Sequence, residues 1–81
     1  MKANFSTPKI SRIKVNNDFT ISLKYGKEKR IFDMKPYLNI GMYKDLQNIE
    51  LFKTARISFD SLEWANGIDI DPEFLYSKSR Q

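Results

Sequence analysis

Residues 19–25 read Phe-Thr-Ile-Ser-Leu-Lys-Tyr, so apolar and polar side chains alternate along the whole stretch. Successive side chains of a β-strand point to opposite faces, and this alternation is typical of a strand with one buried face and one face in water. A strand of this kind usually belongs to an antiparallel sheet. The segments on either side are therefore the first candidates for its partners.

The neighbouring segments predict an antiparallel meander around this strand. Residues 10–15 and 28–34 are rich in apolar side chains and are expected to be strands. Residues 16–18 read Asn-Asn-Asp and residues 26–27 read Gly-Lys, which are turn residues because they tolerate positive φ or bond their own backbone. The first part of the chain is thus expected to form three consecutive antiparallel strands.

The spacing of the apolar residues along the sequence changes in the middle of the chain. Pro36 ends the third strand, since proline lacks the N–H that a sheet requires. Residues 37–52 have apolar side chains three or four positions apart, which predicts short helical turns. Three aromatic residues of this region are expected to cover one end of the sheet, or else to form an exposed patch for a partner: Tyr37, Tyr43 and Phe52.

The second half of the chain resumes the strand pattern and then ends in a helix. Residues 54–59 are expected to be a strand with Ala55, Ile57 and Phe59 on one face, and residues 62–64 its short return strand. Asp71 before Pro72 is typical of a helix N-cap followed by proline at the first helical position, so a helical turn is expected over residues 72–76.

This order of elements predicts an α+β fold. We expect a small antiparallel sheet of about five strands (β-β-β, short helical link, β-β) with a short C-terminal helix. The 81 residues are the size of one domain, with residues 1–9 forming a loose arm and residues 77–81 fraying.

The composition narrows the classes of function. The chain has no Cys and no His, so the usual general base, thiolate nucleophile and soft metal ligands are missing. We therefore expect neither an enzyme nor a metal or cofactor site. The lack of Cys, of a signal-peptide pattern and of a membrane-length apolar run predicts a cytoplasmic protein that does not enter the membrane.

Charge is distributed unevenly along the chain, whose net charge is +4 at pH 7. Residues 1–30 carry eight basic and two acidic side chains, whereas residues 61–81 carry two basic and four acidic ones. Five cations are expected on the wet face of the meander or at its turn: Arg12, Lys14, Lys24, Lys27 and Lys29. Such a patch either contacts the phosphates of a nucleic acid or is a solvated surface that discourages pairing by other strands.

Two segments of the sequence resemble a known bacterial family, domain of unknown function 2442. Residues 32–38 read FDMKPYL and residues 64–76 read WANGIDIDPEFLY, which are similar to the family's middle and C-terminal signatures. The resemblance implies a small α+β domain, in some members fused to a helix-turn-helix segment. It also implies pairing with another small bacterial protein in a suspected toxin–antitoxin arrangement. The family offers no established catalytic residues to carry over.

The C-terminal segment supplies the candidates for a protein interface: Trp64, Asn66, Asp69, Glu73 and Tyr76. Trp64 is either a core residue, as its parity with Leu62 indicates, or an exposed anchor beside Tyr76. Asn66 with Gly67 predicts a turn, and the alternative is a backbone nest for an anion. The spaced carboxylates of residues 69–73 lack the loop pattern of a calcium site, so we expect no metal there.

These observations favour a non-enzymatic protein-binding module. It would hold a small partner protein through its acidic, aromatic C-terminal segment or through an exposed sheet edge. Trp64 and Tyr76 are the expected anchors, and Asp69 and Glu73 the orienting charges. One alternative is a nucleic-acid-binding domain that uses the five cations, and another is self-assembly into a homo-oligomer.

Overall fold

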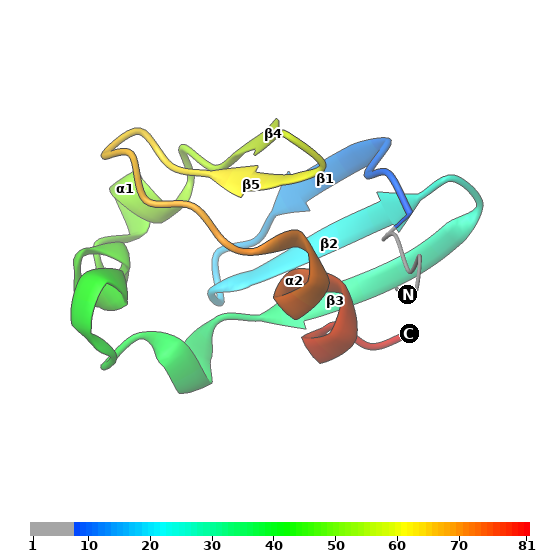
Figure 1. Cartoon of the computed structure of the whole chain (residues 1–81). Helices are drawn as coiled ribbons and strands as arrows, with labels where there is room; N and C mark the ends of the chain where they lie inside the picture. The colour runs from blue at the N-terminus through cyan, green and yellow to red at the C-terminus, as the bar shows by residue number, and fades with distance from the viewer. Residues whose placement is uncertain (1–7) are drawn as a thin grey trace.

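The computed structural model describes residues 8–81, which form two layers (Figure 1). The first layer is an antiparallel sheet in the order β1-β2-β3, with bounds Arg12–Val15, Thr20–Tyr25 and Glu28–Asp33. The second contains the antiparallel hairpin of β4 and β5, Arg56–Ser58 and Ser61–Glu63. The helical segments are η1 (Lys35–Tyr37), η2 (Gly41–Gln47), α1 (Ile49–Phe52) and α2 (Pro72–Lys78).

The meander follows the alternation of the sequence. Ile21, Leu23 and Tyr25 of β2 are buried, whereas Lys24 is exposed, so the predicted inner and outer faces of this strand are confirmed. Leu23 pairs with Ile13 of β1 on one side and with Arg30 of β3 on the other. The inner face of the sheet is therefore the one that the rest of the chain has to cover.

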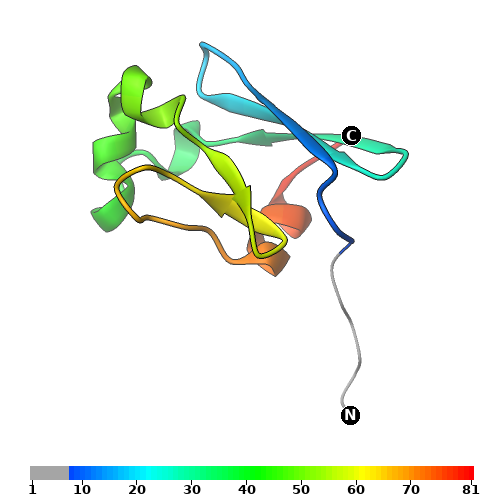
Figure 2. The same cartoon turned by 90° about the horizontal axis from the view of Figure 1, so that it is seen from above.

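The predicted α+β class and the order of the five strands are confirmed, but the strands form two sheets rather than one. The hairpin β4–β5 and α2 lie on the same side of the meander, as Figures 1 and 2 show together. Leu62 and Trp64 join Ile21 and Phe32 in one buried cluster. The hairpin covers this apolar face because covering it buries more side-chain surface than pairing at the sheet edge does.

Trp64 lies at the centre of the core. Its side chain is fully buried and its indole N–H donates a hydrogen bond to the backbone carbonyl of Phe52, at 3.0 Å. The indole also stacks on the Phe52 ring, with 6.2 Å between centroids. The core interpretation of Trp64 is confirmed, and Phe52 covers the end of the sheet as expected.

Helix α2 begins as the sequence predicts and ends two residues later. A carboxylate oxygen of Asp71 accepts a hydrogen bond from the backbone N–H of Phe74 at 3.0 Å, and Pro72 occupies the first turn. Leu75 points into the core and Phe74 packs edge-on against Phe32, with 6.3 Å between centroids. The helix therefore continues to Lys78 because its inner face is packed against the sheet.

Residues 77–81, which the sequence predicts to fray, include the end of α2 and a bridge to β3 in the structure. The backbone N–H and C=O of Arg80 both pair with Ile31 of β3, at 2.9 and 2.6 Å. The Arg30 guanidinium donates to the hydroxyl of Ser79 at 2.6 Å and to its carbonyl at 2.7 Å. The chain end thus serves as a short neighbour for the edge of β3. The loose arm predicted for residues 1–9 falls mostly outside the described residues.

Replacing Trp64 by Phe should lower the free energy of unfolding by about 2–4 kcal/mol. The substitution leaves a small void and removes the donor to the buried Phe52 carbonyl. Urea unfolding followed by far-ultraviolet circular dichroism measures the effect without the lost fluorophore. The control is Tyr43→Phe, at a half-exposed ring, for which a change within about 0.5 kcal/mol is expected. An equally small change for Trp64→Phe would contradict its central role.

Candidate functional site

The sequence-predicted interface residues fall into two groups in the structure. Asn66, Asp69 and Glu73 are exposed, whereas Trp64 is fully buried and Tyr76 is half-buried. Asn66 forms the predicted turn with Gly67, which has a φ of 90°. Its side-chain oxygen accepts a hydrogen bond from the backbone N–H of Ile68 at 3.2 Å. Trp64 is not an exposed anchor, because the packing of the hairpin against the sheet requires it inside.

Tyr76 is engaged within the molecule rather than offered to a partner. Its hydroxyl donates a hydrogen bond to a carboxylate oxygen of Glu28 at 2.9 Å, and its ring lies 4.3 Å from the guanidinium carbon of Arg30. The ring also packs edge-on against Tyr25, with 5.0 Å between centroids. These contacts give Tyr76 a structural role in holding α2 against β3.

Glu28 is the acceptor at the centre of this cluster. Hydrogen bonds from Gln81, Arg30 and Tyr76 stabilise its charged form and lower the pKa of its carboxyl. The same contact raises the pKa of the Tyr76 phenol, because deprotonation would place two anions together. Burial raises the pKa of Tyr25 to about 12, and its buried hydroxyl has no hydrogen-bond partner among the described residues. The cluster therefore connects the chain end to the sheet.

An aromatic recess of about 400 Å³ lies beside the start of α2. It is lined by Tyr37, Ile40, Tyr43, Asp71 and Phe74. Tyr37 stacks on the core residue Phe32 with 5.7 Å between centroids, and Phe74 meets Tyr37 edge-on at 5.2 Å. Ile40 is 54% exposed, and Met42, two residues later in the sequence, is 63% exposed. The recess is therefore a rigid aromatic floor with exposed aliphatic residues at or near its border.

A second recess of about 210 Å³ lies on the other side of residues 69–72, and Phe59 forms part of its lining. Phe59 is 95% exposed, and it occupies the tip of the β4–β5 hairpin. Residues 54–59 were predicted to be one strand, but β4 covers only Arg56–Ser58, so the prediction is wrong for Phe59. Ser58 pairs with Ser61, which leaves Phe59 and Asp60 as a two-residue turn with φ values of 48° and 66°. The turn rather than strand alternation sets their direction.

Residues 69–74 run between the two recesses and give this region its charge. Asp69, Asp71 and Glu73 are exposed, and none of them forms an ion pair among residues 8–81. Asp69 also lies close enough to Tyr43 to raise the pKa of that phenol, after the larger effect of burial. We define the acidic–aromatic surface as Ile40, Tyr43, Phe59, Asp69, Asp71, Glu73 and Phe74.

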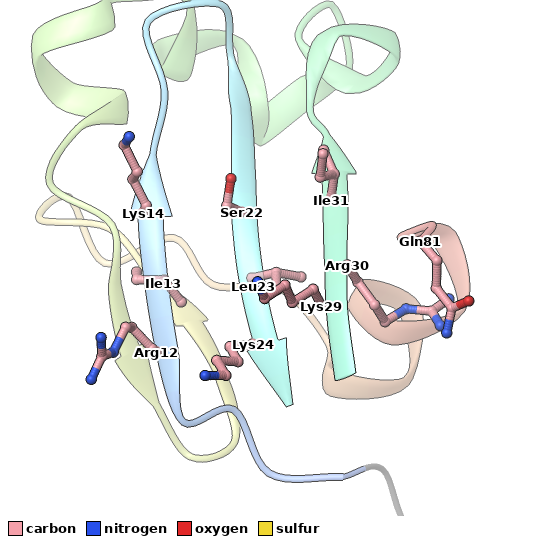
Figure 3. A pocket seen from close by; sticks show the side chains of 10 residues that line it. All are labelled: Arg12, Ile13, Lys14, Ser22, Leu23, Lys24, Lys29, Arg30, Ile31 and Gln81. Carbon is pink, nitrogen blue, oxygen red and sulfur yellow. The ribbon is translucent and has the colours of Figure 1, made fainter. Parts of the chain in front are cut away.

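The predicted cations gather on the outer face of the meander (Figure 3). The register places Arg12 opposite Lys24 and Lys24 opposite Lys29, so these three form one row across the sheet. An open groove of about 340 Å³ follows this face, and Lys14 also lines it. Lys27 lies in the turn after β2 and is not part of the lining. We define the basic groove as Arg12, Lys14, Ser22, Lys24, Lys29 and Ile31.

Three residues of the acidic–aromatic surface were not among the predicted interface residues: Ile40, Phe59 and Phe74. Tyr37 and Tyr43 are half-buried, pack against the core and line the first recess. A signal for Phe59 was present, because pairing Ser58 with Ser61 makes Phe59 a turn residue. No comparable signal marks Ile40, whose exposure depends on how η1 and η2 pack.

These features define a small α+β domain with charged surfaces of opposite sign on the two sides of its main sheet. The chain belongs to the family described as protein of unknown function (DUF2442), whose model matches residues 10–81. This confirms the resemblance seen in its middle and C-terminal signatures. No curated protein and no solved structure matches the chain. Among residues 8–81, no helix has the length and apolar character needed to cross a bilayer.

The Glu28 cluster predicts a specific pH dependence. Because the folded-state pKa of Glu28 is lowered, its stabilisation is complete above the ordinary carboxyl value of 4.5 and is lost as the pH falls through the folded-state pKa. Glu28→Gln should therefore be less stable than the wild type at neutral pH and show a shallower loss of stability below about pH 4.5.

Chemical denaturation at a series of pH values measures this effect. The matched control is Glu73→Gln, which removes an exposed carboxylate that accepts no hydrogen bond from the described residues. The control should keep the wild-type acid dependence. If the free energy of unfolding fell equally with pH in the wild type and in Glu28→Gln, Glu28 would not be the source of this pH dependence.

Proposed function

We propose that this protein is a non-enzymatic protein-binding module whose partner docks on the acidic–aromatic surface. The observation that carries the proposal is the close association of exposed apolar side chains with carboxylates that form no ion pair among residues 8–81. Ile40 and Phe59 are exposed on this surface, where Asp71 lines the same recess as Ile40 and Asp69 the same recess as Phe59. An apolar centre with a charged rim is the usual anatomy of a protein interface.

The chemistry of the surface indicates the kind of partner. Aromatic and aliphatic side chains would accept an apolar side chain in the recess beside α2, and Phe59 would enter a pocket on the partner. The carboxylates favour Lys or Arg on the partner, because complementary charges steer association and exclude wrong partners. The partner is therefore expected to present a basic surface with apolar residues at its centre.

Two further observations support a binding role over catalysis. The chain has no His and no Cys, so a catalytic centre would have to use carboxylates, Lys or Tyr alone. Glu28, whose carboxyl pKa is lowered, accepts three hydrogen bonds that hold α2 and residue 81 against the sheet. These hydrogen bonds explain the lowered pKa of Glu28, so the shift is not a sign of a catalytic carboxyl.

Membership in the family makes the identity of the partner more specific. The resemblance implies a small bacterial protein encoded beside this one, in a toxin–antitoxin arrangement, and we propose a partner of that type. Lack of Cys also suits a reducing cytoplasmic setting. An antitoxin-like role would place the acidic–aromatic surface over a basic functional surface of the toxin.

The double charge reversal Asp69→Lys and Glu73→Lys should weaken partner binding by about tenfold or more, because like charges would then face each other. Both side chains are exposed, so the fold should survive. Wild type and variant are used as baits in the native host, and stoichiometric proteins retained at high salt are identified and titrated. The matched control is Asp45→Lys with Glu50→Lys, two exposed acids outside both recesses. If the wild type, the variant and the control all retained the partner equally, the assignment of Asp69 and Glu73 to the interface would be wrong.

Phe59 allows a test that separates binding from stability. Phe59→Asn should weaken partner binding by roughly tenfold to a hundredfold, as expected for an exposed aromatic hot spot. The same change should leave the melting temperature unchanged or raise it, because Asn tolerates the positive φ of 48° better than Phe does. Calorimetric titration and thermal unfolding are measured on the same preparation. Unaltered affinity would remove Phe59 from the interface.

A further inference from the structure

The outer face of the meander carries a feature that the proposed protein interface does not use. Arg12, Lys24 and Lys29 stand directly opposite one another on three adjacent strands (Figure 3). Neighbouring strands are about 4.8 Å apart, so the row spans about 10 Å. Lys14 extends the positive charge along β1 beside the row. The face points away from the hairpin and α2, on the opposite side of the sheet from the acidic–aromatic surface.

This row is unfavourable for the isolated protein. Like charges placed directly opposite each other in an antiparallel sheet destabilise it. All three side chains are exposed, and none forms an ion pair within residues 8–81. The carboxylates nearest in the strands are already engaged, Glu28 with Arg30 and Asp33 with Lys35. Solvent and salt screen this repulsion, and an anion bound from outside this part of the chain would relieve it further.

The shape of the basic groove indicates which kind of anion fits. Ser22 and Ile31 stand beside Lys14 in the row of residues next to the cation row, and both line the groove. The Ser22 hydroxyl accepts a hydrogen bond from Asn16 at 3.2 Å, so its own proton remains available to an acceptor. None of the residues lining the groove is aromatic or acidic. The groove can therefore hold a chain of anionic groups but offers no surface for stacking bases.

We propose that the basic groove binds the phosphodiester backbone of a nucleic acid without reading its sequence. A nucleic-acid strand supplies anions at regular, closely spaced intervals, which is what a row of cations at strand spacing can neutralise. An acidic protein would instead need several carboxylates held in a line. Contacts to phosphates position a nucleic acid but carry no base information. The groove and the acidic–aromatic surface lie on different sides of the sheet. The nucleic-acid proposal can therefore be tested separately from the proposed protein interface.

The test uses Lys24→Gln with Lys29→Gln, which keeps polar side chains at both positions and removes two charges from the row. Binding to a short DNA duplex of random sequence is measured by fluorescence anisotropy across a range of salt concentrations. Wild type should bind at about 50 mM salt, and the variant should bind at least about tenfold more weakly. The slope of log affinity against log salt should become shallower by about two, near 0.9 for each lost phosphate contact.

The matched control is Lys44→Gln with Lys53→Gln, which makes the same change in net charge outside the groove. It should retain nearly wild-type affinity and slope. The row variant should also melt about 1–5 °C higher than the wild type at low salt, because two repulsive pairs are removed. This increase would show that weaker binding does not come from unfolding.

Three results would overturn the proposal. The first is no DNA binding by the wild type at low salt. The second is an equal loss of affinity in the control variant, which would attribute binding to net charge alone. The third is displacement of the DNA by polyglutamate at an equal concentration of charge, which would assign the groove to an acidic protein or to the acidic surface of a second copy.

Discussion

The inner face of the β1-β2-β3 meander must be covered, and most of the structure follows from this requirement. A three-stranded sheet with one apolar face is not stable in water unless other elements pack on that face. The chain meets the requirement with Leu62 and Trp64 from the hairpin and Leu75 from α2. The hydrogen bond from Trp64 to the Phe52 carbonyl joins the hairpin to the helical link. The core is therefore assembled from segments far apart in the sequence.

Covering one face of the sheet also separates the charges of the molecule. The covering elements carry the acidic residues 69–73, so negative charge gathers on their side. The outer face stays open, and its wet positions are the basic ones of β1, β2 and β3. The asymmetry between the two halves of the sequence thus becomes an asymmetry between two sides of a domain. Each side is suited to a different class of partner.

The features that the sequence predicted correctly depend on local rules. Alternation fixed the faces of β2, and Asp71 before Pro72 marked the start of α2, because neighbouring residues alone decide these structures. The gathering of Arg12, Lys24 and Lys29 followed from the same alternation once the strands were paired as a meander.

The features that could not be predicted from the sequence depend on contacts between residues far apart in the chain. The division into two sheets, the tie of Arg80 to Ile31 and the internal contacts of Tyr76 all require the three-dimensional packing. Phe59 was misplaced for a different reason, since shifting a turn by one position reverses the face of every neighbouring side chain. Two features that local physics disfavours lie on the proposed surfaces: an exposed Phe at positive φ and a row of opposed cations. Departures of this kind are typical of positions that serve function rather than folding. On each proposed surface, a partner would offset an unfavourable feature of the free protein.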